Sequence, residues 1–409
     1  MAALFLPCAG GAEQLLADEV RRITGRAGEA TRGGVWVEGD PLAAMRLNLE
    51  SRLAQRVLWP LIDGPYRDEH DLYDLARHVP WPDWITPAQT LRVDVNAGRG
   101  KSSSPLQSLN FAALRIKDAV CDVLRDATGE RPSVDTHRPD LPLALYVGPD
   151  HATLYADTSG EALFKRGWRD AQGGRVDVKG EAPLKETLAA AMLAAAGWQG
   201  RAEDGPLLDP CCGAGTIAIE AAQMACGIAP GVQRRFAFER MLPFREHLPA
   251  WQALKQAAQS RVHAPNVAVF AGDVSFRLTD FATRNAERAG VSHAIEFKTA
   301  DALQRMPPAP SGVLMMNPPY GERIAAKGQG SDTAREGFEG GGSSAEFFSG
   351  LASHWKRHYP GWTAWLLSPD MKLPSLMRLK ESRRVPMWNG PIECRLFRFD
   401  LVAGSARSS

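Results

Sequence analysis

The stretch that decides the fold is LLDPCCGAGTIAIEAA, residues 207–222. It reads as the end of an apolar strand, an acidic residue, a glycine turn and the start of an apolar helix. Gly213 and Gly215 permit a sharp turn and leave no Cβ atom in the way of a ligand. A second buried strand, VLMMNPPYGER (313–323), ends in an Asn-Pro-Pro-Tyr group. Two strand-terminal motifs in this order predict an α/β fold with a binding site at the carboxyl edge of a parallel sheet.

The two motifs resemble those of class I S-adenosylmethionine-dependent methyltransferases that act on exocyclic amino nitrogens. The first motif is DPxCGxGT rather than the GxGxxG of dinucleotide-binding proteins, which favours a methyltransferase over a dehydrogenase. The resemblance implies a Rossmann-like domain with S-adenosylmethionine as its cofactor. The cofactor-binding residues that it implies are Asp209, Cys212, Gly213, Ala214, Gly215, Thr216, Asp273, Asp301, Ala302 and Asn317.

Each implied contact has a chemical reason and a plainer alternative. The free N–H groups at the start of the helix after Gly215 would meet the amino-acid end of the cofactor. Asp273, which ends the strand VAVFAGD, would accept the ribose hydroxyls. It lacks the second acidic residue that often follows in the family, and it could instead be a surface residue. Asp301 would bind the adenine amino group beside Ala302, or it could simply cap a helix.

The catalytic residues implied by the resemblance are Asn317, Pro318, Pro319 and Tyr320. The proline pair stiffens the backbone. The Pro318 carbonyl and the Asn317 side-chain oxygen are two acceptors that match the two donors of an exocyclic amino group. Tyr320 offers a ring on which the target base can stack. A proline turn without catalytic function is the alternative.

Composition predicts a soluble, cytoplasmic globular protein with more than one domain. Hydrophobic residues make up 44% and charged residues 23% of the 409 residues, and no apolar run is long enough for a transmembrane helix. The N-terminus lacks the basic start of a signal peptide. The six cysteines form no CxxC pair, so we expect reduced thiols and no metal site, with Cys211-Cys212 packed in the turn.

Net charge is +1, but the first 160 residues are net acidic and the remainder is net basic. We expect five regions: an N-terminal ferredoxin-like α/β part (1–60), an α+β RNA-binding domain (61–158), a linker (159–182), the methyltransferase domain (183–402) and a disordered tail (403–409). Hydrophobic periodicity predicts helices over 41–57, 111–129 and 183–198, and a β-hairpin over 143–160. Residues 226–262 read as an insertion, and the glycine-rich stretch 325–345 as a loop that closes over the substrate.

The helix SLNFAALRIKDAVCDVL followed by a proline-containing strand and a hairpin resembles the THUMP RNA-binding module. Together with PLKETLAAAM, LLDPCCGAGT, NPPYGER and NGPIEC, this order resembles the bacterial 23S ribosomal RNA guanine-N2 methyltransferases of the RlmL type. The resemblance implies methyl transfer to a guanine N2 of 23S rRNA before full subunit assembly, with no membrane, no metal and no obligatory protein partner. The second methyltransferase domain and its activity are not expected here. The alternatives are a tRNA guanine-N2 methyltransferase, a DNA adenine-N6 methyltransferase and a non-catalytic RNA-binding or assembly factor.

Overall fold

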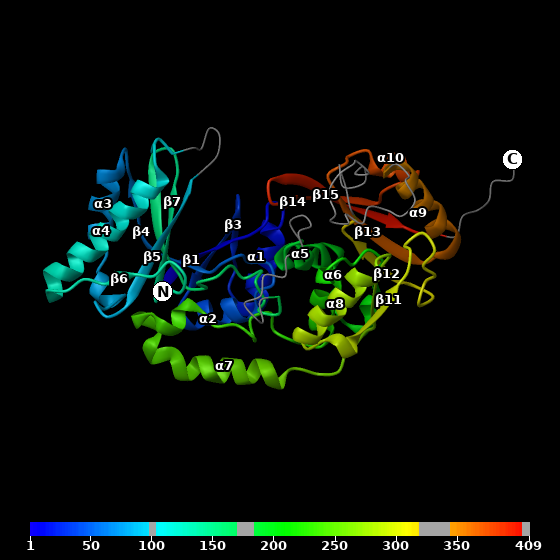
Figure 1. Cartoon of the computed structure of the whole chain (residues 1–409), viewed down its shortest axis with the longest axis horizontal. Coiled ribbons are helices and arrows are strands. Elements are labelled where there is room, and N and C mark those ends of the chain that lie inside the picture. The colour runs from blue at the N-terminus through cyan, green and yellow to red at the C-terminus, as the bar shows by residue number, and fades with distance from the viewer. Residues whose placement is uncertain (98–103, 170–183, 319–343, 403–409) are drawn as a thin grey trace. The chain divides into compact units, whose positions relative to one another are not determined.

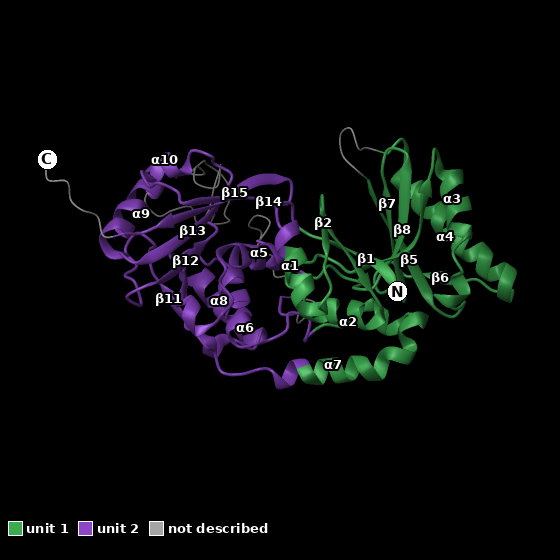
Figure 2. Ribbon diagram, turned by 180° about the vertical axis from the view of Figure 1, so that it is seen from behind, with its two compact units in different colours: residues 1–8, 16–163, 234–257 green, residues 9–15, 164–233, 258–409 purple. Residues whose placement is uncertain are grey.

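The computed structural model describes residues 1–97, 104–169, 184–318 and 344–402 (Figure 1). These residues form two compact units, which Figure 2 shows in different colours. Unit 1 comprises residues 1–8, 16–163 and 234–257, and unit 2 comprises residues 9–15, 164–233 and 258–409. Pro319, Tyr320 and nearly all of the predicted glycine-rich loop lie outside the described residues.

Unit 1 contains one mixed sheet of eight strands in the order β2-β3-β1-β4-β8-β7-β5-β6. The bounds are β1 Ala2–Pro7, β2 Glu29–Thr31, β3 Gly34–Gly39, β4 Leu58–Pro65, β5 Thr90–Ala97, β6 Ser133–Val134, β7 Leu141–Val147 and β8 His151–Asp157. The predicted hairpin is confirmed: β7 and β8 are antiparallel, with Leu145 opposite Leu154. The sheet is continuous from the range predicted as ferredoxin-like into the range predicted as THUMP, because β4 pairs with both β1 and β8.

The helices of unit 1 are α1 (Glu13–Thr24, whose first turn belongs to unit 2), α2 (Pro41–Glu50), α3 (Glu69–Arg77), α4 (Leu109–Thr128) and most of α7 (Leu248–Ser260). The helix predicted over 41–57 is wrong beyond Glu50. The buried Glu19 carboxylate accepts hydrogen bonds from the Ser51 hydroxyl at 2.6 Å and from the Arg52 and Leu53 amides at 2.9 and 3.2 Å. These groups are therefore satisfied outside a helix, by a residue that is distant in the sequence.

The helix predicted over 111–129 is confirmed as α4. The stripe that faces the core repeats every four residues, at Ala112, Ile116, Val120 and Leu124. Phe111 and Leu114 lie outside that stripe and are 41% and 49% exposed. The Arg115 guanidinium covers the Phe111 ring at 4.9 Å from its centroid.

Residues 234–257 return to unit 1, although they lie within the sequence range expected for the methyltransferase domain. Arg234 donates a hydrogen bond to the Glu161 carbonyl at 2.8 Å. The ring of Phe244 packs edge-on against Trp59, with centroids 5.7 Å apart. The segment therefore completes the core of unit 1.

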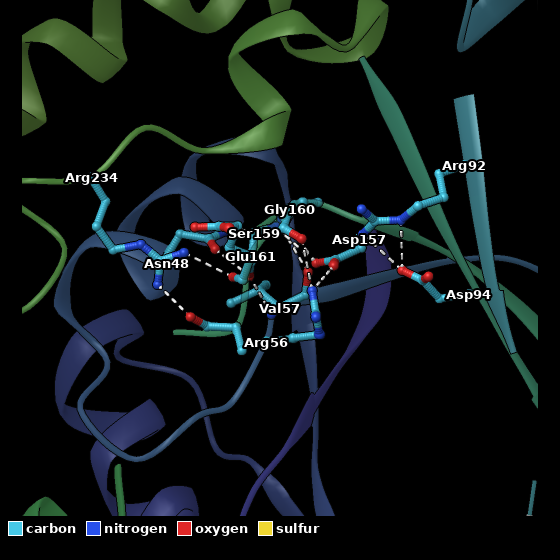
Figure 3. A network of polar contacts seen from close by, with 12 residues as sticks. Asn48, Arg56, Val57, Arg92, Asp94, Asp157, Ser159, Gly160, Glu161 and Arg234 are labelled. Atoms are coloured by element: carbon cyan, nitrogen blue, oxygen red, sulfur yellow. Dashed lines mark hydrogen bonds and ion pairs between the residues drawn. The ribbon is translucent and has the colours of Figure 1, made fainter. Parts of the chain in front are cut away.

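A polar network closes this unit where β8 ends (Figure 3). The buried Asp157 forms an ion pair with the partly exposed Arg56, and Arg56 also donates to the Gly160 carbonyl at 3.0 Å. The Ser159 hydroxyl donates to the Asn48 side chain at 2.6 Å. These bonds fix the path of the chain as it leaves the sheet.

Unit 2 contains a seven-stranded sheet in the order β11-β10-β9-β12-β13-β15-β14. The bounds are β9 Leu207–Asp209, β10 Val269–Asp273, β11 Ile295–Thr299, β12 Gly312–Met316, β13 Trp362–Ser368, β14 Arg383–Asn389 and β15 Ile392–Asp400. The strands from β11 to β13 are parallel, and β15 and β14 add an antiparallel pair at one edge. This is the predicted Rossmann-like α/β architecture.

The helices of unit 2 include α5 (Glu186–Ala196), α6 (Thr216–Ala225), α8 (Phe276–Arg288), α9 (Ser344–His358) and α10 (Leu373–Met377). The helix predicted over 183–198 is confirmed as α5, which ends at Gly197 with φ 74°. Among the tryptophans that lie in protein cores and are at most 2% exposed are Trp168, Trp251, Trp355, Trp362 and Trp365. In the described parts of the chain, no helix is both long and apolar enough to cross a membrane.

Candidate functional site

The sheet of unit 2 brings the predicted site residues to one edge. Strand β9 lies between β10 and β12, with Asp209 level with Ala271 and Leu208 level with Leu314. Because these strands are parallel, Asp273 and Asn317 each stand two residues beyond the level of Asp209 at the carboxyl edge. Such an edge, beside the strand where the order reverses, is the ligand-binding position of doubly wound folds.

The turn after β9 has the geometry that its glycines suggest. Gly213 has φ 51° and Gly215 has φ 82°, both in the left-handed region. A Cβ atom at Gly215 would lie 3.1 Å from Ala282 Cβ, so α6 and α8 require a glycine there for close packing. A Cβ atom at Gly213 would meet no atom within 4 Å, so this side of the turn faces open space.

The carboxylates of Asp209 and Asp273 accept hydrogen bonds from backbone amides of this turn. Asp209 is 1% exposed and accepts a hydrogen bond from the Cys211 amide at 3.2 Å. Asp273 accepts one from Gly213 at 3.0 Å and another from Ser275 at 3.1 Å. Burial raises the pKa of Asp209 well above its ordinary value. The hydrogen bond from the Cys211 amide lowers the pKa, but less than burial raises it, and the negative charge of Asp273 raises it further.

The vicinal cysteines are packed, as predicted. Cys212 is buried, and its amide donates to the Gly272 carbonyl at 2.8 Å. Burial raises the pKa of both thiols well above the ordinary value, and the carboxylates of Asp209 and Asp273 raise it further. Both thiols are therefore protonated near neutral pH, which does not favour redox or nucleophilic chemistry.

Asp301 lies two residues beyond the carboxyl end of β11. One of its carboxylate oxygens accepts a hydrogen bond from the Leu303 amide at 2.9 Å. Its backbone carbonyl accepts one from the Arg305 backbone amide at 2.9 Å. Asp301 thus stabilises the turn, which is the alternative that the sequence left open. The second carboxylate oxygen has no hydrogen-bond partner among the described residues, and Ala302 beside it is buried.

Asn317 carries an unsatisfied acceptor. Its Oδ1 atom is enclosed by protein and has no hydrogen-bond partner within the described ranges. Pro318 is buried directly after it. Leaving a buried acceptor unpaired costs about 1–3 kcal/mol, so this amide oxygen at the carboxyl edge is a candidate acceptor for a ligand donor.

Sequence reasoning missed a group of ion pairs around α6. Arg166 and Glu220 form a pair at 2.9 Å with side chains that are 1% and 0% exposed. Arg169 pairs with Glu186 at 2.8 Å and donates a hydrogen bond to the Thr216 hydroxyl. The available signal was a single acidic residue inside each of the apolar helices IAIEAA and ETLAAA.

Arg166 and Arg169 contact the first two turns of α6, which directly follow the glycine turn. Thr216 is the first residue of α6, and Glu220 lies one turn later. Burial raises the pKa of Glu186 to about 7, although the charge of Arg169 opposes the shift. The predicted cofactor turn is thus held both by the carboxylates of β9 and β10 and by two arginines from the segment before α5.

Comparison with known proteins identifies the family. Residues 172–398 match the family described as the RMKL-like methyltransferase domain. The chain belongs to this methyltransferase family. Two further regions of this RMKL-like methyltransferase match the THUMP domain (66–157) and the RlmL ferredoxin-like domain (3–58). The prediction of a THUMP-containing class I methyltransferase is confirmed, and S-adenosylmethionine is the cofactor of that class.

Relatives of this RMKL-like methyltransferase include two proteins named ribosomal RNA large subunit methyltransferase K/L. The protein from Shewanella baltica (strain OS195) is 36% identical over 98% of this chain and 54% of its own length. The protein from Psychromonas ingrahamii is 35% identical over 97% of this chain and 50% of its own length. The chain therefore spans about half the length of the curated relatives it matches.

Solved structures share the fold over almost the whole chain. A protein from Listeria monocytogenes, named a predicted N6-adenine-specific DNA methylase, is 27% identical with a TM-score of 0.79, over 97% of this chain and 96% of its own. The protein SMU.472, solved with SAH, has a TM-score of 0.81 at 24% identity over 98% of both chains. At that identity, the second likeness concerns the fold alone.

Proposed function

We propose that this chain transfers a methyl group from S-adenosylmethionine to the exocyclic N2 amino group of a guanine in 23S ribosomal RNA. The observation that carries the proposal is the buried, unpaired Oδ1 atom of Asn317 at the carboxyl edge of β12. The names of the K/L relatives support ribosomal RNA as the substrate class.

The residues at this edge fit the cofactor. The open space at Gly213 and the free N–H groups at the start of α6 suit the amino-acid end of the cofactor. Asp209 would attract its ammonium group, Asp273 would accept the ribose hydroxyls, and Asp301 with Ala302 would bind the adenine. When bound, the cofactor supplies a methyl group on a sulfonium that needs no further activation.

The chain's own residues position the amine. Asn317 Oδ1 and the Pro318 carbonyl each accept one N–H bond from the guanine amino group. These two bonds orient the nitrogen lone pair toward the methyl carbon and out of conjugation with the ring. The amine held in this way would take the methyl group that the bound cofactor supplies and would then lose a proton to solvent. Positioning supplies most of the rate enhancement, with stacking of the base on Tyr320.

The target guanine has to leave its stack to reach this edge. We therefore propose 23S rRNA before full subunit assembly as the substrate, with the THUMP-containing unit adding RNA affinity but no chemistry. A tRNA guanine would satisfy the same two acceptors. So would an adenine N6 amino group in DNA, in keeping with the name of the Listeria protein, but a THUMP domain favours RNA.

The test is methylation of naked 23S rRNA, assembled large subunits, tRNA and duplex DNA, followed by mass analysis of the nucleosides. N2-methylguanosine in naked 23S rRNA is the expected product. Asn317→Ala should abolish turnover and leave cofactor affinity nearly unchanged. The matched control is Asn266→Ala, an exposed asparagine whose side chain makes no hydrogen bond within the described residues. Near-normal turnover of Asn317→Ala would refute the amine-orienting mechanism.

A further inference from the structure

A shallow groove lies between α9 and α10, outside the residues assigned to the cofactor and the amine. Its volume is about 470 Å³, within the range of ligand sites. The lining residues from α9 are Ala345, Glu346 and Ser349, and those from the α10 region are Ser375, Leu376 and Arg378. The groove thus combines apolar side chains with two hydroxyl groups, one carboxylate and one guanidinium.

The topology places this groove beside the substrate edge. Strand β13 is the parallel neighbour of β12, with Met316 level with Leu366. The chain enters α10 within a few residues of the carboxyl end of β13, so α10 begins next to the edge that carries Asn317. Helix α9 approaches the same edge, because a Cβ atom at Gly350 would lie 3.5 Å from Leu303 in the Asp301 turn.

The groove lining holds one cation, Arg378, and one acid, Glu346. Further exposed cations lie close to Arg378 in the sequence, at Lys372 and Lys380, and at the carboxyl end of α9, at Lys356 and Arg357. None of the five forms an ion pair with a described residue. Lys356 instead donates a hydrogen bond to the Arg378 carbonyl at 2.8 Å, which joins the carboxyl ends of the two helices. Nearby acids are engaged: Glu381 pairs with Arg384, and Asp370 accepts from the Lys372 amide at 2.8 Å.

Arg378 is also held in an unusual conformation. It ends α10 with φ 48°, in the left-handed region, as the only described non-glycine residue with positive φ. Its side chain is exposed and forms no ion pair with a described residue. Phosphate is a ligand that such a guanidinium fork matches.

We propose that this groove binds single-stranded RNA next to the target nucleotide. Arg378, with Lys372 and Lys380, contacts phosphates, and the hydroxyls of Ser349 and Ser375 contact a ribose, whose 2′-OH distinguishes RNA from DNA. The inference rests on the proposed function only for the identity of the RNA. The groove supplies a contact to the substrate within unit 2 itself, separate from the THUMP domain.

The test measures binding of a fluorescent single-stranded RNA and of the DNA strand of the same sequence, at several salt concentrations. For Arg378→Glu, we expect RNA affinity to fall by about tenfold and the slope of log K against log salt to fall by about one. Arg378→Lys should retain most of the affinity. Calorimetry should give unchanged cofactor affinity, and thermal unfolding should show that the variant is folded.

The control is Lys298→Glu, an equal charge reversal on β11, at the opposite edge of the parallel strands. It should leave both affinity and salt slope near wild type. Wild-type RNA binding by folded Arg378→Glu, or equal losses in the two variants, would overturn the groove assignment. Because binding is measured without methyl transfer, failure to modify 23S rRNA would refute the proposed function while leaving this result intact.

Discussion

The amide of Gly213 donates a hydrogen bond to Asp273 Oδ2 at 3.0 Å and so joins the glycine turn after β9 to the carboxylate at the end of β10. The other oxygen of Asp273 accepts the Ser275 amide at 3.1 Å, at the start of α8. One carboxylate therefore fixes two turns at the proposed cofactor edge.

Replacing Asp273 with alanine should weaken S-adenosylmethionine binding, because it removes the proposed ribose contact and releases the Gly213 turn. We expect a loss of about 1–3 kcal/mol by calorimetry. Asp273→Asn keeps one acceptor oxygen and should fall between the wild type and the alanine variant. Asp280→Ala, on the exposed part of α8, is the control. Unchanged affinity in Asp273→Ala would remove this residue from the cofactor site.

Cofactor binding should weaken as the pH falls, because of Asp209. Burial raises the pKa of this carboxyl well above its ordinary value in the free protein, whereas a bound ammonium group would favour the ionised form. Binding then releases a proton, and affinity drops by up to about tenfold per pH unit below the raised pKa. Calorimetry from pH 5 to 8 in buffers of different ionisation enthalpy measures both effects.

Asp209→Asn should bind the cofactor more weakly and with a flatter pH profile. Asp280→Asn should retain the wild-type profile. An Asp209→Asn protein that keeps the wild-type pH slope and proton release would show that another group titrates on binding.

The candidate site could be predicted from the sequence because its signals are local. The short apolar strands β9 and β10 end in Asp209 and Asp273, and Asn317 directly follows β12; parallel strands gather such ends at one edge. The glycine turn required only two positive-φ positions, Gly213 and Gly215, in the order that the motif gives.

The features that could not be predicted depend on residues far apart in the sequence. Arg166 meets Glu220 across 54 positions, and no periodicity relates the two. The helix predicted over 41–57 stops early because a carboxylate from α1, Glu19, takes the hydrogen bonds of residues 51–53. In both cases a buried charged side chain contacts residues that only the tertiary fold brings near it. Local helix propensity carries no information about such contacts.

The buried pair Arg166–Glu220 should contribute strongly to the stability of unit 2. Removing one partner, as in Arg166→Met, leaves an uncompensated buried carboxylate and should cost about 3–5 kcal/mol in urea unfolding. The double variant Arg166→Met/Glu220→Leu should recover part of that loss. In the exposed pair Arg284–Asp280, Arg284→Met should change stability by less than about 1 kcal/mol. Equal small effects in both pairs would contradict a structural role for the buried one.

A fragment of residues 160–409 tests the division of labour between the two units. All proposed cofactor residues lie in unit 2, so the fragment should still bind S-adenosylmethionine while losing most activity on 23S rRNA. It should also be less stable than the full chain, because residues 234–257 lose the core of unit 1 against which they pack. Phe244, which is fully buried and contacts Trp59, would then be exposed and should raise the binding of an apolar dye.

In the full chain, Phe244→Ala should destabilise unit 1 by about 3–5 kcal/mol, without lowering cofactor affinity. Urea unfolding and calorimetry on the same samples separate the two effects. Full rRNA activity in the fragment would refute the assignment of RNA affinity to the THUMP-containing unit. A large loss of cofactor affinity in Phe244→Ala would instead show that residues 234–257 support the cofactor edge.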